Sequence, residues 1–259
     1  MDAKLDKKYP DFKDAVVLLV LFLVISFAID GLLMLGKRVT GFSLKEHPAS
    51  NLLSSIYFLS LILLVVKRRK IRPRDLVQYN HVGLEMYLSL ILMFSGTIIL
   101  LSEFDNVFQS LFPPPEWLTS VFSQNNYWFA FTVIIAAPVI EEVFFRGILL
   151  RGFVANYSPR SALILSALFF AVFHFNPWQF FPAFFAGLAL GWWVLHTKSI
   201  VPAIVAHIFF NCISLIVSNL GIRIPGFTTK GQAQPIWFNI LGLFLFVLGI
   251  CLANHKKQK

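Results

Sequence analysis

The stretch from Ala130 to Leu150 reads AFTVIIAAPVIEEVFFRGILL, and it places Glu141 and Glu142 side by side in a segment apolar enough to lie in a membrane. Ionisable side chains at membrane depth are costly and rare, and by default they mark a functional site. Two neighbouring carboxylates cost more than one. The pair therefore raises two questions: whether this chain spans a membrane, and which polar groups lie beside the glutamates.

The composition answers the first question. The chain has 259 residues, of which 57% are hydrophobic and 14% charged, against about 25% charged in soluble domains. Its mean hydropathy is +0.73. These values predict an all-α, polytopic membrane protein built as one transmembrane domain over residues 1–259. The net charge of +9 does not indicate a nucleic-acid partner, because the Lys and Arg residues lie in short clusters beside apolar runs, as membrane topology requires.

Eight apolar stretches are long enough, or nearly so, to cross a hydrocarbon core of about 30 Å, which takes about 20 helical residues. The second and fifth are short, and flanking polar residues are expected to extend them. The sequence thus predicts a bundle of about eight transmembrane helices. The predicted spans are residues 15–36, 51–66, 83–102, 127–150, 161–175, 180–196, 200–220 and 235–253.

The positions of the basic residues predict the orientation of these spans. With both termini in the cytoplasm, 17 of the 22 Lys and Arg residues fall on the cytoplasmic side, which satisfies the positive-inside rule. This orientation requires an even number of spans. The two cysteines, Cys212 and Cys251, lie in apolar segments without metal-ligand spacing, so we expect them to be small packing residues.

Helix geometry separates the two glutamates. Glu142 and Arg146 are four residues apart, so they stack on one helix face and can form an ion pair. Glu141 lies about 100° around the helix from its neighbour and cannot share that face. One carboxylate is therefore expected to be structural, while Glu141 is free to face other groups. The alternative is that both glutamates merely bridge helices. Pro138, just ahead of them, is expected to loosen the backbone.

Two further pairs of polar or aromatic side chains lie at helical spacing in later spans. Phe170 and His174 share one face in the fifth span, and His207 and Asn211 share one face in the seventh. Each pair alone could be interhelical packing or hydrogen bonding. A carboxylate, two imidazoles and a carboxamide that converge in a dry bundle would instead form a site that activates water or binds a metal.

These patterns occur in the order seen in a known family. The segment Glu141–Arg146 (EEVFFR) matches EExxxR, Phe170–His174 (FAVFH) matches FxxxH, and His207–Asn211 (HIFFN) matches HxxxN/D. Over a motif core of residues 137–211 the chain resembles the CPBP intramembrane proteases, which include the CAAX prenyl endopeptidases and the bacterial Abi proteins. Each motif alone is weak, and their order in successive predicted spans carries the resemblance.

The resemblance implies an intramembrane endopeptidase that hydrolyses a peptide bond of a membrane-associated or lipidated, CAAX-type protein or peptide. Glu141 would activate the water, with support from His174, and His207 and Asn211 would stabilise the oxyanion. Glu142, Arg146 and Phe170 would support the structure. The protein would then be a multi-pass integral membrane protein in contact with lipid, located in the cell membrane if its source is a prokaryote. Its oligomeric state stays open.

The resemblance leaves the mechanism open, because members of this family are commonly labelled metalloproteases. Glu141, His174 and His207 could together hold Zn²⁺, which needs three protein ligands and an open position. In that arrangement the Arg-paired Glu142 would be the only carboxylate left to act as base. A metal-free mechanism uses each residue once, so we favour it.

Two other functions also fit the sequence. A proton-coupled transporter could use Glu141 and the histidines as a relay, although no internal repeat is visible and the inner charges lie in only three spans. A non-catalytic membrane adaptor could keep the same fold, although no motif residue is lost. The substrate stays open: a prenylated protein, a bacteriocin and a signalling peptide precursor all fit.

Overall fold

The computed structural model describes residues 9–122, 126–219, 223–228 and 232–257, and in these ranges the fold is all-helical with no β-strand. Helix makes up 82% of the structure. Helices satisfy their backbone hydrogen bonds internally, which a segment in hydrocarbon must do. Large apolar side chains are exposed along several helices, including α1, α4 and α12. Such surfaces are suited to lipid rather than to water.

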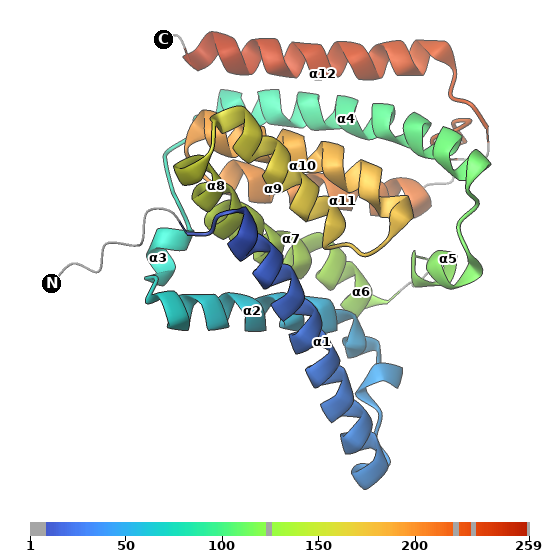
Figure 1. Cartoon of the computed structure of the whole chain (residues 1–259). Coiled ribbons are helices and arrows are strands. Elements are labelled where there is room, and N and C mark those ends of the chain that lie inside the picture. The colour runs from blue at the N-terminus through green and yellow to red at the C-terminus, as the bar shows by residue number, and fades with distance from the viewer. Residues whose placement is uncertain (1–8, 123–125, 220–222, 229–231, 258–259) are drawn as a thin grey trace, which may run out of the picture.

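Figure 1 shows the order of the helices along the chain. The first half of the chain contains α1 (Phe12–Thr40), η1 (Leu44–Glu46), η2 (Pro48–Leu52), α2 (Leu53–Arg69), α3 (Pro73–Leu76), α4 (Leu84–Leu111) and α5 (Glu116–Phe122). The second half contains α6 (Tyr127–Phe131), η3 (Thr132–Ala136), α7 (Ala137–Glu142), η4 (Val143–Leu150), α8 (Arg151–Asn156), α9 (Pro159–Val172), α10 (Pro177–Thr197), α11 (Val201–Asn219) and α12 (Ile236–Lys257).

Five helical segments within the described ranges are long and apolar enough to cross a membrane: Phe12–Thr40, Pro48–Arg69, Leu84–Leu111, Pro177–Thr197 and Ile236–His255. Two shorter apolar helices cover Pro159–Val172 and Val201–Val217. Within the described residues, each of the eight predicted spans lies mostly in helix, and the structure supports a multi-pass membrane protein. Whether all eight cross the membrane, and with which orientation, stays a prediction.

The segment that carries the glutamate pair is one helical run from α6 to α8, interrupted by two π-helical parts, η3 and η4. In η3 the N–H of Ala137 donates to the carbonyl of Thr132, five residues back. The next residue, Pro138, has no N–H to donate. The carbonyl of Val133 therefore loses the partner that the same π-helical register would give it. π-helical segments are rare and occur frequently at functional sites.

The run from α6 to α8 lies at the centre of the fold, with α2 on one side and α9, α10 and α11 on the other (Figure 1). Its buried aromatic side chains form the core with those of neighbouring helices. The Phe145 ring contacts the rings of Phe58 on α2 and Phe170 on α9, with centroids 5.7 and 4.9 Å apart. The central run is therefore held on both sides by packed rings.

The helices α4 and α12 form an outer pair (Figure 1). A Cβ added to Gly96 would collide with the backbone of Gly242 and Phe246, and one added to Gly249 would collide with the backbone of Met93. The two helices thus touch through their backbones, as small residues at membrane helix interfaces allow. The same applies to α9 and α10, where Gly187 lies against Ala167.

Candidate functional site

The glutamate pair begins with a buried ion pair. Arg146 Nε lies 3.0 Å from Glu142 Oε2, and both side chains are fully buried. The N–H is not aligned with this contact, so it is an electrostatic contact rather than a well-directed hydrogen bond. Arg146 Nη2 also donates to the carbonyl of Gly187 on α10, at 3.2 Å. The structure thus pairs Glu142 with Arg146, as their spacing predicts, and ties the pair to a second helix.

Glu142 also contacts His207 on α11, which the sequence did not predict. His207 Nδ1 lies 3.0 Å from Glu142 Oε1 in a buried environment. When Glu142 is ionised it can only accept, and the shared proton is then on Nδ1 of the ring. Arg146, Glu142 and His207 therefore form one chain of charged and polar contacts from η4 to α11.

Glu141 lies on the other side of the same imidazole. His207 Nε2 is 4.0 Å from Glu141 Oε2, and the Glu141 side chain is 16% exposed while that of Glu142 is 0% exposed. The distance exceeds that of a hydrogen bond. The two glutamates thus differ as helix geometry predicts: Glu142 is enclosed and paired, while Glu141 keeps some accessible surface.

The expected location of His174 needs a correction. The fifth span was predicted to continue to residue 175, but α9 ends at Val172 and His174 lies in the turn that follows. Phe175 has a positive φ of 49°, and Asn176 caps α10 ahead of Pro177. Residues before a proline avoid the helical region, so this turn is encoded locally. His174 Nδ1 still contacts the carbonyl of Phe170, at 2.7 Å.

Asn211 is directed at the irregular part of the central run. Its Nδ2 donates to the carbonyl of Val133, at 2.8 Å. This is the carbonyl whose π-helical partner would have been the missing N–H of Pro138. Asn211 thus supplies the donor that Pro138 lacks, and it joins α11 to η3. One amide N–H is used in this bond, and an Asn side chain has a second.

Phe170 connects the members of the site through its ring. The Arg146 guanidinium lies 4.6 Å from the ring centroid, which is a cation–π distance. The rings of His174 and His207 meet it edge-on, with centroids 5.0 and 5.7 Å away. Phe170 is itself only 2% exposed. Phe170 thus contacts three of the predicted site residues, and its supporting role stays a prediction.

The predicted zinc ligands are not arranged around a common point. Within the described residues, which include Glu141, His174 and His207, no three His, Cys, Asp or Glu side chains gather closely enough to hold a metal ion. The contacts of the two histidines with Glu142 and with the Phe170 carbonyl use Nδ1 and leave Nε2 of each ring open, as in histidines that bind a metal. It is the spatial arrangement of the three side chains, rather than their chemistry, that does not fit Zn²⁺, so no chemical step below involves a metal.

Sequence patterns missed three partners at this site. The contact of Glu142 with His207 joins residues 65 positions apart, and no local spacing reports it. The carbonyls of Gly187 and Val133 belong to the backbone and carry no side-chain signal. Pro138 was the one available clue to Val133, because a proline in a helix leaves a carbonyl without its donor.

The apolar helices and the buried contact between Glu142 and His207 together define a class of protein: multi-pass membrane proteins with ionisable side chains inside the helix bundle. Residues 123–213 match the family model described as "Type II CAAX prenyl endopeptidase Rce1-like". This match covers about a third of the chain and supports the resemblance to the CAAX proteases seen in the motifs. No curated protein and no solved structure matched the chain. The matched description is that of a family of endopeptidases.

Proposed function

We propose that this protein is an intramembrane endopeptidase that cleaves a membrane-associated or lipidated, CAAX-type protein or peptide by means of a water activated at Glu141. The family match supports the reaction class. The observation that carries the assignment of roles is the position of His207 between two unequal carboxylates, 3.0 Å from the enclosed Glu142 and 4.0 Å from the more accessible Glu141.

The contact with Glu142 determines what His207 can do. Because Nδ1 carries the proton shared with Glu142, a neutral ring has only a lone pair at Nε2. To donate a hydrogen bond to an oxyanion from Nε2, the ring must be the imidazolium. The Glu142 carboxylate stabilises that cation, as the buried aspartate does in a Ser-His-Asp triad. Glu142 is then a positioning residue with an electrostatic task.

The reaction follows from these roles. Glu141 accepts a proton from water as the water oxygen bonds to the scissile carbonyl carbon, and the carbonyl oxygen becomes an oxyanion. The Nε2–H of the His207 imidazolium and the second N–H of Asn211 donate to that oxyanion. The C–N bond then breaks, and the protonated Glu141 returns its proton to the leaving amine. We assign His174 to the orientation of the water or of Glu141.

We further propose that the chain crosses the membrane eight times with both termini in the cytoplasm. The positive-inside distribution of the Lys and Arg residues supports this orientation. The start of α1 and the end of α12 lie on the same side of the bundle (Figure 1). Labelling of single cysteines placed at Lys13 and at His255, in sealed vesicles of known orientation, tests it, with the native Cys212 and Cys251 replaced by Ala. Accessibility from opposite sides would overturn the even number of spans.

The catalytic proposal is tested with purified protein in liposomes and a farnesylated CAAX peptide that carries a fluorophore and a quencher. We expect cleavage by the wild type, and a loss of about 10²- to 10⁴-fold in kcat for Glu141→Gln, because removal of a general base costs that much. Retained cleavage in Glu141→Gln would rule out the general-base role. If no lipidated peptide is cleaved, an unmodified membrane peptide library tests the wider substrate class.

Two controls separate the alternatives. The metal content of the purified protein and cleavage in the presence of a chelator distinguish the metal-free mechanism from a zinc enzyme. A proton flux assay in the same liposomes tests the transporter alternative. A wild-type protein that moves protons and cleaves none of the peptides would replace the protease proposal, and one that does neither would favour a non-catalytic adaptor.

A further inference from the structure

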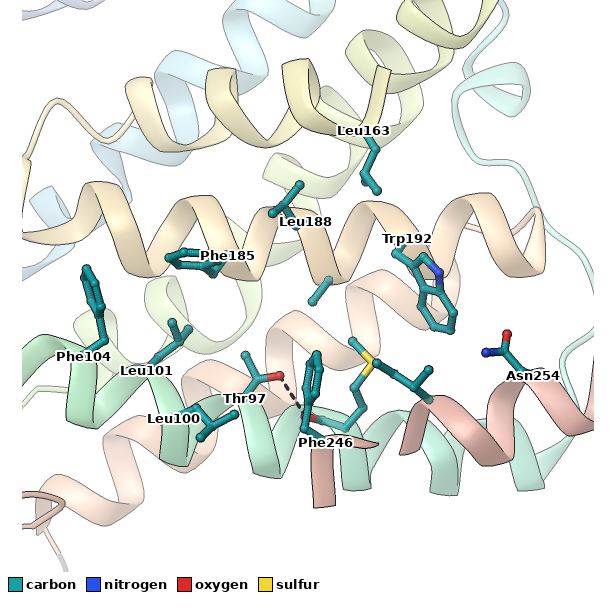
Figure 2. Close-up of a pocket in the computed structure, with 13 residues that line it drawn as sticks. Thr97, Leu100, Leu101, Phe104, Leu163, Phe185, Leu188, Trp192, Phe246 and Asn254 are labelled. Atoms are coloured by element: carbon teal, nitrogen blue, oxygen red, sulfur yellow. Dashed lines mark hydrogen bonds between the residues drawn. The ribbon is translucent and has the colours of Figure 1, made fainter. Parts of the chain in front are cut away.

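An apolar cavity of about 550 Å³ lies between α4, α10 and α12, with Leu163 of α9 also in its wall, and none of the predicted site residues lines it. Apart from Thr97, Asn254 and the indole N–H of Trp192, its walls are carbon and sulfur. Figure 2 shows that the hydroxyl of Thr97 is turned back to its own helix, where it donates to the carbonyl of Met93, at 2.8 Å. The middle of the cavity therefore offers no free polar group, and it is suited to a hydrocarbon chain.

The two ends of the cavity differ. Figure 2 shows Phe104, Leu101 and Phe185 at one end, and Trp192 and Asn254 at the other. Phe104 and Phe185 are 38% and 42% exposed, so the first end opens at an apolar surface. The second end carries an indole and a carboxamide, groups that are suited to the interface between lipid chains and headgroups.

Basic residues occur at the helix ends nearest the polar end of the cavity. His196 on α10 contacts the carbonyl of Ala253 on α12, at 3.3 Å, which brings the end of α10 beside that of α12. Exposed Lys198 follows α10 directly, exposed Arg160 begins α9 one turn before Leu163, and the sequence of α12 ends in Lys256-Lys257. The four helix ends that meet here carry one acidic residue, Glu85 at the start of α4. Their charge balance is positive.

We propose that this cavity is a binding site for an anionic phospholipid, with one acyl chain between α4, α10 and α12 and the headgroup at Lys198 and Arg160. The chain chemistry follows from the apolar walls, and the headgroup charge follows from the basic rim. Basic pockets between transmembrane helices bind anionic headgroups. The α10 residues that line the cavity lie on the opposite face of that helix from Gly187, whose carbonyl accepts from Arg146. The lipid would fill the space between α10 and the α4–α12 pair.

The test measures the thermal unfolding of the delipidated full-length protein in detergent, with added dioleoylphosphatidylglycerol or dioleoylphosphatidylcholine. We expect the anionic lipid to raise Tm by several degrees more than the neutral one. Ala189→Phe places a large side chain in the cavity and should remove the response to both lipids. Val205→Phe, on the exposed surface of α11 and outside the cavity, is the matched control and should respond like the wild type.

A second variant tests the headgroup separately. Lys198 has a left-handed backbone with φ of 56°, which Asn tolerates better than most residues, so Lys198→Asn with Arg160→Gln removes two charges with little strain. This variant should respond equally to the two lipids. Equal responses of the wild type, or an Ala189→Phe protein that responds like the wild type, would overturn the proposal.

A measurement on the wild type keeps the proposal testable if Ala189→Phe does not fold. A phosphatidylglycerol with a photoreactive group at the end of one acyl chain is activated in liposomes, and the labelled peptides are identified by mass spectrometry. We expect labelling concentrated on α4, α10 and α12 around Leu101, Leu188 and Phe246. Labelling spread evenly over the exposed residues of α1 and α11 would contradict a defined site.

Discussion

The α4–α12 pair and the central run from α6 to α8 contact their neighbouring helices through opposite kinds of residue. In the outer pair, Gly96, Gly242 and Gly249 carry no side chain, so that the backbones of α4 and α12 touch along the helices. In the central run, Glu142, Arg146, His207 and Asn211 reach other helices through charges and hydrogen bonds. An apolar cavity borders the first arrangement, whereas the polar contacts of the second fix the position of each group.

This difference indicates where a functional site can lie in such a bundle. Glycine contacts impose close approach but define no chemistry, whereas a buried ion pair is costly and specifies its partners one by one. The polar region therefore has the stronger geometrical constraint, and the outer pair has the larger tolerance for a guest molecule. The following variants test this comparison, beginning with the largest expected effect.

Removal of the charge at Arg146 should destabilise the protein most. Arg146→Met leaves Glu142 as a buried carboxylate with one polar partner, His207, and loss of one member of a buried pair costs about 3–5 kcal/mol. Unfolding in detergent, followed by circular dichroism, measures the loss. The exposed Arg160→Met is the control and should change stability by less than about 0.5 kcal/mol.

A double variant shows whether the charge itself or the size of the side chain matters. Glu142→Leu combined with Arg146→Met removes both charges and should recover a large part of the lost stability, because an apolar replacement of a buried pair is often neutral. If the double variant is as unstable as Arg146→Met, packing around the guanidinium, including the Phe170 ring, accounts for the effect.

The outer pair should respond to added volume instead of lost charge. In Gly96→Ala the new Cβ would meet the backbone of Gly242 and Phe246, so the helices must separate, at a cost of about 1–3 kcal/mol. Gly31→Ala on α1 is the matched control, since nothing lies within 4 Å of its Cβ, and it should be neutral or stabilising by about 0.5–1 kcal/mol. Equal effects of the two variants would show that α4 and α12 do not touch as described.

Sequence patterns located the helices and the Glu142–Arg146 pair, because both follow from local spacing. They failed where the chain leaves the α-helical register. The end of α9 before His174 was encoded by Asn176 and Pro177, a signal that the apolar run concealed. In the π-helical part η3, the side-chain donor to the Val133 carbonyl is Asn211, which lies 78 residues away. The contact of His207 with Glu142 is a tertiary feature of the same kind.

The bond between Asn211 and Val133 should have an intermediate effect. Asn211→Leu keeps the size of the side chain but leaves the Val133 carbonyl without its side-chain donor, which costs about 1–2 kcal/mol for a partly buried group. Asn211→Asp is the informative comparison, because a carboxylate cannot donate to a carbonyl. Hydrogen exchange of the amides in η3 should rise in both variants. Unchanged exchange in Asn211→Leu would mean that the π-helical part is held by its own backbone.

The smallest expected effect on stability belongs to the residue with the largest expected effect on activity. Within the described residues, the partner given for the Glu141 carboxylate is His207, at 4.0 Å, which is longer than a hydrogen bond. The Glu141 side chain keeps 16% of its surface exposed. We therefore expect Glu141→Gln to change the free energy of unfolding by less than about 0.5 kcal/mol, although kcat falls by orders of magnitude. Glu142→Gln should instead destabilise the protein, because it weakens the contact with Arg146. It should also change the position of the proton on the His207 ring, which the ¹⁵N chemical shifts of the ring nitrogens report. If the two glutamine variants lose stability equally, the glutamates share one structural role, and the division of labour between the buried and the accessible carboxylate is wrong.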